Sequence, residues 1–218
     1  MNKQFIYQNK YNTPVEVRAA DGAVGALLRV LLHVIWAVIL FLCVTSPAHA
    51  QGSAGPYVPT PTVIVDELLK LADIKRGEYV IDLGSGDGRI VVTAAKRYGA
   101  QGYGIDIQPS LVELARENAR KEGVADRVRF IAGDLFDSDL SKADVITVYL
   151  LPSSVPLLVP KLMKELRPGA RVVSHDYPLL PWVPEKVLSF DFEEKVMISG
   201  TTRTVLYRYI VPPRPAGK

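Results

Sequence analysis

The stretch that most constrains the fold of this chain is Tyr79–Val91, YVIDLGSGDGRIV. An apolar run is followed by alternating glycines and then by a second apolar run. This pattern predicts a buried strand that turns sharply into a helix. Glycines at such a turn let the backbone approach a ligand, and the N-terminus of the helix favours negative charge. We therefore expect a nucleotide-like ligand at this turn.

The spacing of the glycines separates three classes of ligand. A phosphate-binding loop needs G-x-x-x-x-G-K-[ST], and no such string follows this strand. A dinucleotide fold needs G-x-G-x-x-G, but the third position counted from Gly84 and Gly86 is Arg89. Asp87 in the turn would repel a pyrophosphate and suits a cation, and Asp82 adds a second carboxylate. The turn therefore favours a ligand with an ammonium group where NAD carries phosphate.

The next predicted strand, GYGID, ends on Asp106. An acidic residue about twenty residues beyond such glycines accepts hydrogen bonds from a ribose diol. A ligand with a ribose, a positive charge and no phosphate matches S-adenosylmethionine, which carries an adenosine, an amino group and a sulfonium. The residues thus predict S-adenosylmethionine as the cofactor.

Strand and helix patterns alternate along much of the chain, which predicts a parallel sheet with helices on both faces. Near the C-terminus, segments 190–200 and 201–211 alternate apolar and polar residues around Gly200, which predicts an antiparallel hairpin at the sheet edge. The predicted strands before this hairpin are 79–83, 102–106, 128–134, 143–151 and 170–177, and the predicted helices are 63–74, 89–99, 109–122 and 153–166.

The first 50 residues have the pattern of a leader. Val30–Val44 is apolar apart from one histidine, basic residues precede it, and Ala48 and Ala50 form an A-x-A cleavage site. The alternative is an uncleaved anchor, whose membrane contact would be confined to residues 23–46. Cleavage after Ala50 would export the domain to the periplasm, whereas an uncleaved leader would anchor it to the membrane.

The remaining chain is divided into a linker (51–62), a cofactor-binding domain (63–211) and a frayed tail (212–218). Without the leader, which holds four basic and two acidic side chains, the net charge falls from +3 to +1. A domain with so small a net charge lacks the excess of basic residues that is typical of nucleic-acid-binding proteins. The single cysteine, Cys43, lies in the leader, so we expect no disulfide and no thiolate metal site in the domain, and we identify no metal-ligating residues.

The motif IDLGSGDG (81–88), in combination with Asp106, resembles the class I S-adenosylmethionine-dependent methyltransferases. The resemblance extends from Gly55 to Ile210. It implies a Rossmann-like three-layer α/β sandwich with a seven-stranded, mostly parallel sheet and a C-terminal antiparallel hairpin. It further implies that the glycine turn holds the methionine part, Asp106 the ribose and Asp134 the adenine amino group. The cofactor-binding residues on this basis are Asp82, Gly84, Gly86, Asp87, Gly88, Asp106, Asp134 and Leu135.

Three shorter strings, PYVPTP, YLLP and LRPGARVVSHDYPLLPW, resemble the ATP synthase c-subunit lysine methyltransferase family and its bacterial relatives. This resemblance implies N-methylation of a lysine in a small or membrane-embedded protein. It also implies that Tyr57, Tyr149 and Pro152 line the acceptor channel. His175 and Asp176 depart from the family pattern, and we interpret them as polar groups at a strand end.

Two other functions stay open. A small-molecule methyltransferase would need a larger insertion over its pocket, and the short connections here argue against one. A non-catalytic cofactor-binding module of the cell envelope is favoured by the leader, because export would separate the domain from cytoplasmic S-adenosylmethionine. We expect a monomer that acts on a protein.

Overall fold

The computed structural model describes residue 33 and residues 57–214. The predicted leader apart from residue 33, the first half of the predicted linker (51–56) and the end of the predicted tail (215–218) lie outside the described residues. Within the part of the chain that the structure describes, no helix is both long enough and apolar enough to cross a membrane.

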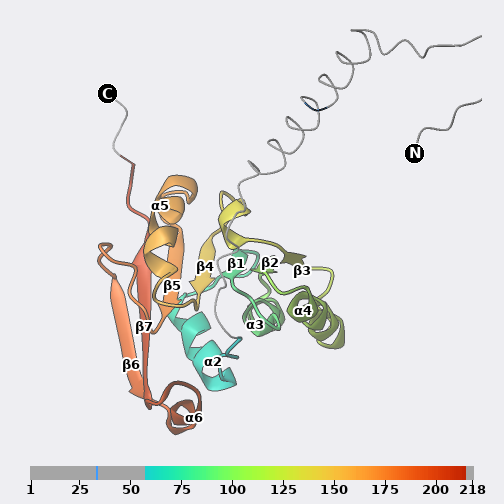
Figure 1. The fold of residues 1–218 in the computed structure, drawn as a ribbon, viewed down its shortest axis with the longest axis horizontal. Helices are drawn as coiled ribbons and strands as arrows, with labels where there is room; N and C mark the ends of the chain where they lie inside the picture. The colour runs from blue at the N-terminus through green and yellow to red at the C-terminus, as the bar shows by residue number, and fades with distance from the viewer. Residues whose placement is uncertain (1–32, 34–56, 215–218) are drawn as a thin grey trace, which may run out of the picture. The chain divides into compact units, whose positions relative to one another are not determined.

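Residues 57–214 are built around a seven-stranded sheet with the order β3-β2-β1-β4-β5-β7-β6 (Figure 1). Neighbouring strands from β3 to β5 run parallel, whereas β7 runs antiparallel to both β5 and β6. This confirms the predicted fold class. The strands are β1 (Tyr79–Leu83), β2 (Gln101–Asp106), β3 (Val128–Ala132), β4 (Val145–Val148), β5 (Arg171–His175), β6 (Lys186–Asp191) and β7 (Arg203–Ile210).

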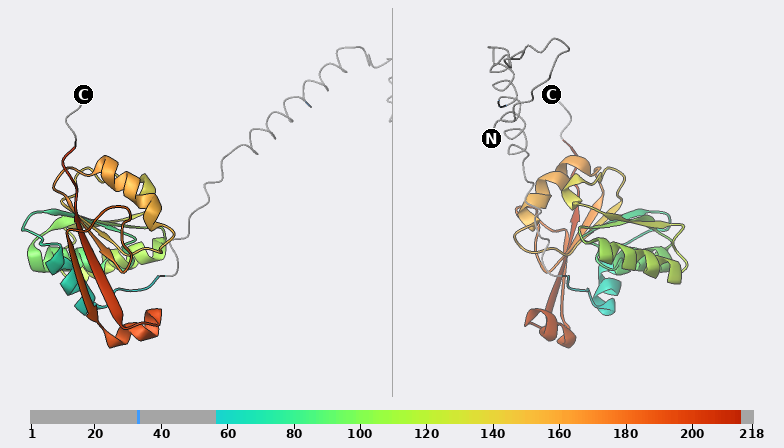
Figure 2. Two further views of the ribbon diagram at one scale, coloured as in Figure 1. Left: turned by 90° about the vertical axis from the view of Figure 1, so that its left-hand side faces the viewer. Right: turned by 45° about the vertical axis from the view of Figure 1, so that its right-hand side comes forward.

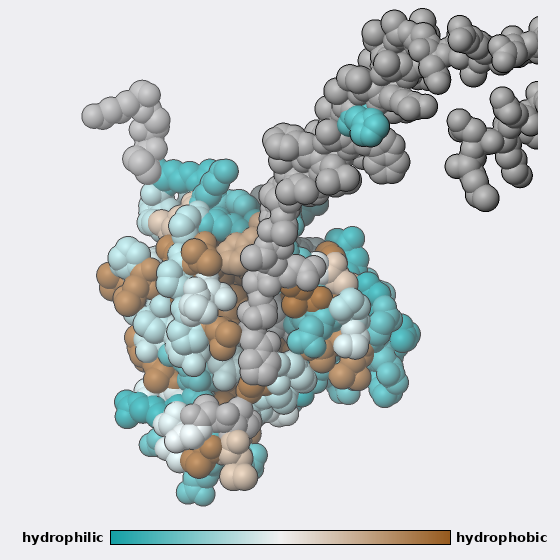
Figure 3. Space-filling view, in the orientation of Figure 1, coloured by the Kyte–Doolittle hydropathy of each residue, from teal (hydrophilic) through white to brown (hydrophobic). Residues whose placement is uncertain are grey.

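Helices cover both faces of the sheet and complete the three layers seen in Figures 1 and 2. One face carries α2, α3 and α4, and the other carries α5. The helices are α2 (Thr62–Leu71), α3 (Arg89–Tyr98), α4 (Pro109–Lys121) and α5 (Val155–Glu165). On the face of residues 57–214 that Figure 3 shows, apolar and polar side chains are interspersed.

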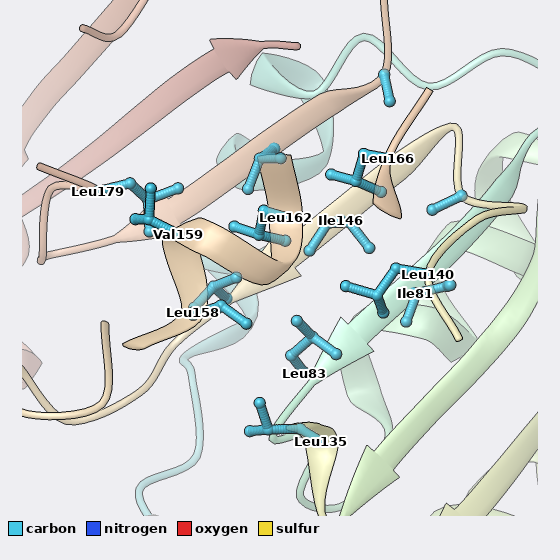
Figure 4. Packing of buried hydrophobic residues seen from close by; sticks show 14 of the residues in the cluster. Ile81, Leu83, Leu135, Leu140, Ile146, Leu158, Val159, Leu162, Leu166 and Leu179 are labelled. Carbon is cyan, nitrogen blue, oxygen red and sulfur yellow. The ribbon is translucent and has the colours of Figure 1, made fainter. Parts of the chain in front are cut away.

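The core explains why β1 reads as a continuous apolar run. Ile81 and Leu83 point into the layer under α5, while Val80 points into the layer under α2 and α3. In Figure 4, Leu162 of α5 lies beside Ile146 of β4. Burial on both faces fixes β1 at the centre of the sheet, and with it the position of the glycine turn that follows.

The C-terminal hairpin forms, but the predicted position of its first strand was wrong. The strand β6 ends at Asp191, and the residues that follow form the 3₁₀ turn η2 (Glu193–Lys195) and the short helix α6 (Val196–Ser199). Gly200 ends α6 with φ +72°. A glycine in the left-handed region commonly closes a helix, so Gly200 ends a helical turn here rather than a tight turn between strands.

The beginning of the predicted tail is also attached to the domain. The Arg214 guanidinium donates hydrogen bonds to the carbonyls of Lys164 and Leu166, at distances of 2.9 and 3.1 Å. The expectation of a frayed tail was therefore wrong for this residue, because a cation satisfies carbonyls that the end of α5 leaves without partners.

Candidate active site

The candidate site lies where the strand order reverses, between β1 and β4. In open α/β sheets, ligands bind at such a switch point, outside the carboxyl ends of the strands. The turn 84–88 after β1 and the residues Tyr149 and Leu150 after β4 meet there. They surround a cavity of about 60 Å³.

The glycines of the turn are required by backbone conformation and by close neighbours. Gly84 and Gly86 have φ values of +79° and +52°, which residues with a Cβ atom rarely adopt. A Cβ atom on Gly84 would lie 2.8 Å from Cδ2 of Leu150, and one on Gly86 would lie 2.3 Å from Cε2 of Tyr57. The N–H of Gly84 also donates to the carbonyl of Ile105, which joins the turn to β2.

Asp106, the last residue of β2, holds the same turn through its side chain. Its Oδ2 accepts a hydrogen bond from the N–H of Gly86 at 2.8 Å, and its Oδ1 accepts one from the N–H of Gln108 at 2.9 Å. A carboxylate offers about four lone-pair sites, so these two bonds leave acceptor capacity for a ligand. Asp106 lines the cavity and is suited to bind a diol.

Asp82 is buried beneath the turn, with 2% of its surface exposed. Its Oδ1 accepts a hydrogen bond from the hydroxyl of Thr147 at 2.6 Å. Burial raises the pKa of Asp82 to about 7, against the lowering effect of the Thr147 hydrogen bond and with the help of the Asp106 and Asp87 charges. A cation in the cavity would therefore favour ionisation of this carboxyl group. Sequence analysis missed Thr147, although a polar residue within an apolar strand is a signal.

Asp87 forms an ion pair with Arg89, the residue that stands where a dinucleotide motif has its third glycine. Its Oδ2 lies 2.6 Å from Nη2 of Arg89, and its Oδ1 lies 2.9 Å from Nε. Burial raises the pKa of Asp87, but the hydrogen bonds and charge of Arg89 outweigh burial and hold that pKa below its ordinary value. The sequence suggested a carboxylate available to a ligand cation, whereas the structure gives Asp87 an internal cation as its partner.

The segment 57–60 passes over the glycine turn. The ring of Tyr57 lies against Gly86, and the carbonyl of Thr60 accepts a hydrogen bond of 2.8 Å from Nη1 of Arg89. Partial burial and the charge of Asp87 raise the pKa of the Tyr57 hydroxyl. The structure thus brings Tyr57, predicted from sequence, to the cavity.

Tyr149 stands at the carboxyl end of β4 and is stacked on His175, at the end of β5. The ring centroids are 4.0 Å apart and the rings are tilted by 32°. Burial raises the pKa of Tyr149 to about 12 and lowers that of His175 to about 4. Both side chains are therefore neutral at physiological pH, and this side of the site carries no charge from either ring.

Four predicted residues do not line this cavity. Gly88, at the end of the turn, is the N-cap of α3 with a φ of +78°, and a Cβ atom on it would lie 2.6 Å from the ring of Phe130. Asp134 accepts a hydrogen bond from the N–H of Phe136 and lines a neighbouring cavity of about 430 Å³. Leu135 is buried in the core, and Pro152 is exposed in the turn before α5. The N–H of Gly133, the residue before Asp134, donates to the Asp106 carbonyl, so the backbone that leads to Asp134 is joined to the end of β2.

Several residues line the cavity without having been predicted. They are Val58, Pro59, Thr60, Ser85, Arg89, Ile90, Gln108, Leu111 and Leu150. Of these, Val58, Ser85, Arg89 and Leu150 adjoin a predicted residue in the chain, and the other five carry no such signal.

The chemistry of the site fits the predicted cofactor, but the size of the cavity fits only in part. The hydroxyl of Ser85 is buried without a hydrogen-bond partner, and the turn offers bare backbone beside two carboxylates. Ligand cavities usually measure roughly 300–1,000 Å³, well above the space present. Because the ring of Tyr57 lies on Gly86, a shift of the segment 57–60 would enlarge the cavity.

Comparison with known proteins supports this assignment. A family model for the ANTKMT methyltransferase domain matches residues 82–186. A protein-lysine N-methyltransferase from Saccharolobus islandicus is 38% identical over 157 residues, which cover 72% of this chain and 93% of that protein. The ATP synthase c-subunit lysine N-methyltransferase of Xenopus laevis is 39% identical over 132 residues, and the match covers 61% of this chain and 58% of the Xenopus protein.

A solved structure adds a third relative. An RNA methyltransferase from Salinibacter ruber, in complex with S-adenosyl-L-homocysteine, has 45% sequence identity and a TM-score of 0.65. The match covers 74% of this chain and 98% of that chain.

Proposed function

Because this chain belongs to the family of S-adenosylmethionine-dependent protein-lysine N-methyltransferases, we propose that it methylates a lysine side chain of a protein. The observation that carries the proposal is the convergence of the turn 84–88, Asp106 and Tyr149 on one cavity at the switch point of the sheet. S-adenosylmethionine supplies an electrophilic methyl group on a sulfonium.

The residues around the turn are suited to hold that cofactor. Asp106 has acceptor capacity for the ribose hydroxyls. Asp82, whose pKa of about 7 leaves it partly protonated, ionises more fully beside a cationic amino group. The segment 57–60 covers the turn and would exclude water from the cofactor once both are in place. We assign the adenine amino group to Asp134, because the backbone of the preceding residue, Gly133, is hydrogen-bonded to Asp106.

The surroundings of Tyr149 are suited to a lysine acceptor. A lysine amine has an ordinary pKa near 10.4, and only its uncharged form can attack a methyl group. Desolvation in an uncharged environment lowers that pKa. The neutral rings of Tyr149 and His175, together with the buried Leu150, offer such an environment at the carboxyl end of β4. No catalytic base is needed if the site favours the neutral amine.

Radiolabelled S-adenosylmethionine and a cell extract test this function. We expect label in a protein band that protease removes and RNase does not, and mass spectrometry should place the methyl group on a lysine nitrogen. RNA is the second acceptor to test, because the Salinibacter relative is described as an RNA methyltransferase. Label that RNase removes would contradict the lysine proposal, as would label found only in small molecules.

We also propose that the acceptor is a small or membrane-embedded protein and that the enzyme acts as a monomer. The first part is supported by the Xenopus relative, which is named for the c-subunit of ATP synthase. Residues 1–50 would export the domain if cleaved after Ala50 and would otherwise anchor it. N-terminal sequencing of the native protein distinguishes these cases, because Gln51 as the first residue means cleavage. Light scattering of the purified protein measures its oligomeric state.

A further inference from the structure

The imidazole of His175 is a buried polar group without a partner. Its exposed fraction is 1%, and neither Nδ1 nor Nε2 has a hydrogen-bond partner in the structure. Leaving a buried polar group unsatisfied costs stability, whereas an apolar ring of similar shape would carry no such cost. Packing alone therefore does not explain why a histidine occupies this position.

His175 lies directly behind the candidate site. It ends β5, and its ring contacts Tyr149 at a centroid distance of 4.0 Å. Tyr149 in turn lines the cavity together with Gly84 and Leu150. Tyr149 is the only described side chain for which the structure gives a ring contact with His175. A small shift of the Tyr149 side chain would therefore open a path from the cavity to His175.

The backbone next to His175 is strained and held in place. Asp176 has a φ of +63°, in the left-handed region that residues other than glycine seldom adopt. Its Oδ1 accepts hydrogen bonds from Nζ of Lys195 at 2.6 Å and from the N–H of Val205 at 3.2 Å. Lys195 is buried as well and also donates to the carbonyl of Arg203. Strain of this kind tends to occur at functional sites, where the surrounding structure maintains it.

We propose that the amine of the bound acceptor donates a hydrogen bond to His175, so that the imidazole and Tyr149 together orient the nucleophile for methyl transfer. This inference rests on the proposed function, because it requires an amine acceptor beside Tyr149. An attacking amine points its lone pair at the methyl group and keeps its N–H bonds for acceptors on the enzyme. A neutral imidazole has one acceptor nitrogen, and an imidazolium has none.

The charges around His175 are compatible with this role. Oδ1 of Asp176 lies 3.6 Å from Nε2 of His175, and the charge of Lys195 balances that of Asp176. Burial, which outweighs the raising effect of Asp176, lowers the pKa of His175 to about 4. The imidazole therefore keeps its acceptor nitrogen throughout the pH range in which a lysine amine becomes neutral. Shifts of side chains at an interface on binding are common, so burial behind Tyr149 does not prevent contact.

The substitution His175→Phe tests the proposal, because it keeps the aromatic contact with Tyr149 and removes both nitrogens. We expect kcat to fall at least tenfold, the KM for S-adenosylmethionine to stay unchanged and the melting temperature to rise. Thr204→Val is the matched control, because Oγ1 of Thr204 is also buried without a partner but Thr204 does not line the cavity. This control should raise the melting temperature and leave kcat unchanged.

A second variant and a spectroscopic measurement make the test independent of folding and of turnover. His175→Gln restores a hydrogen-bonding group and should be more active than His175→Phe. The chain has three histidines, so its ¹⁵N-imidazole NMR spectrum contains few signals and that of His175 can be assigned. We expect the His175 nitrogens to shift when the acceptor is added with S-adenosylhomocysteine, and not when its target lysine is replaced by methionine.

Two results would overturn the proposal. One is a kcat for His175→Phe that lies within twofold of the wild-type value, or that is no lower than the kcat of His175→Gln. Either outcome would mean that His175 serves only in packing. The other is an unchanged His175 spectrum on addition of the acceptor. Failure of the proposed function would look different, because the wild-type enzyme would then label no protein. In that case the same variants would be measured with the acceptor that does carry label. If that acceptor is not an amine and His175→Phe still loses activity, the inference is also contradicted.

Discussion

At the scale of single residues, Asp106 joins the glycine turn to the cavity that we propose holds the cofactor. Its carboxylate orders the turn through Gly86 and leaves lone pairs for the ribose. Replacement by alanine should therefore weaken binding of S-adenosylmethionine at least tenfold in calorimetry. Asp126→Ala is a suitable control, because Asp126 is exposed and does not line the cavity. Tight binding of NAD to the wild-type protein would contradict the assignment of the cofactor.

Asp82 should make stability depend on pH in an unusual direction. An unfolded aspartate loses its proton near pH 3.9, whereas the folded protein holds the Asp82 proton up to about pH 7. Between these values the folded state binds more protons, so this group's contribution to the free energy of unfolding falls as pH rises. Denaturant unfolding from about pH 4 to pH 7 should show a smaller decline for Asp82→Asn than for the wild-type protein. Equal slopes in the two proteins would mean that Asp82 is already ionised in the folded state.

At the scale of elements, the strand-turn-helix unit could be predicted, whereas its ion pairs could not. Periodicity and glycine spacing are local, and they place β1, the turn and α3 correctly. The hydrogen bonds of Arg89 to Asp87 and to the Thr60 carbonyl depend on where the segment 57–60 packs in the folded chain. No local sequence pattern indicates that position. The start of the hairpin was missed for a different reason. The alternation of Phe190, Asp191, Phe192 and Glu193 suggests a strand that continues to Gly200. The strand instead ends at Asp191, and Gly200 closes the helical turn that follows.

Arg89 should control how firmly the segment 57–60 closes over the cofactor. Its guanidinium links Asp87 of the turn to the carbonyl of Thr60. Arg89→Met keeps much of the side-chain volume and removes both links, so the release rate of S-adenosylmethionine should rise several-fold in a displacement assay. Arg97→Met should leave that rate unchanged, because Arg97 lies on the same helix α3 but is paired with Asp66 of α2 and does not line the cavity. An unchanged release rate for Arg89→Met would show that the segment is held by other contacts.

At the scale of the whole molecule, the sequence predicts the order of the layers. The apolar pattern of each strand shows whether one or both of its faces are buried, and therefore where helices must cover the sheet. The sequence does not predict where the functional unit begins. The expected domain starts at residue 63, but Tyr57 and Thr60 line the cavity. The sheet and the hydrophobic clusters of residues 57–214 use none of the residues 57–61, so the fold and the cofactor site have different N-terminal limits.

Two truncations should separate these limits. A protein comprising residues 51–218 retains all the described elements and the cavity, so its melting temperature and its affinity for S-adenosylmethionine should equal those of the full chain. A protein comprising residues 63–218 keeps the sheet and most of α2 but loses Tyr57 and the Thr60 carbonyl that Arg89 contacts. It should fold, with a lower melting temperature, and bind the cofactor at least tenfold more weakly. Calorimetry and thermal unfolding measure both quantities, and equal affinities for the two truncations would mean that the cofactor site does not include the segment 57–60.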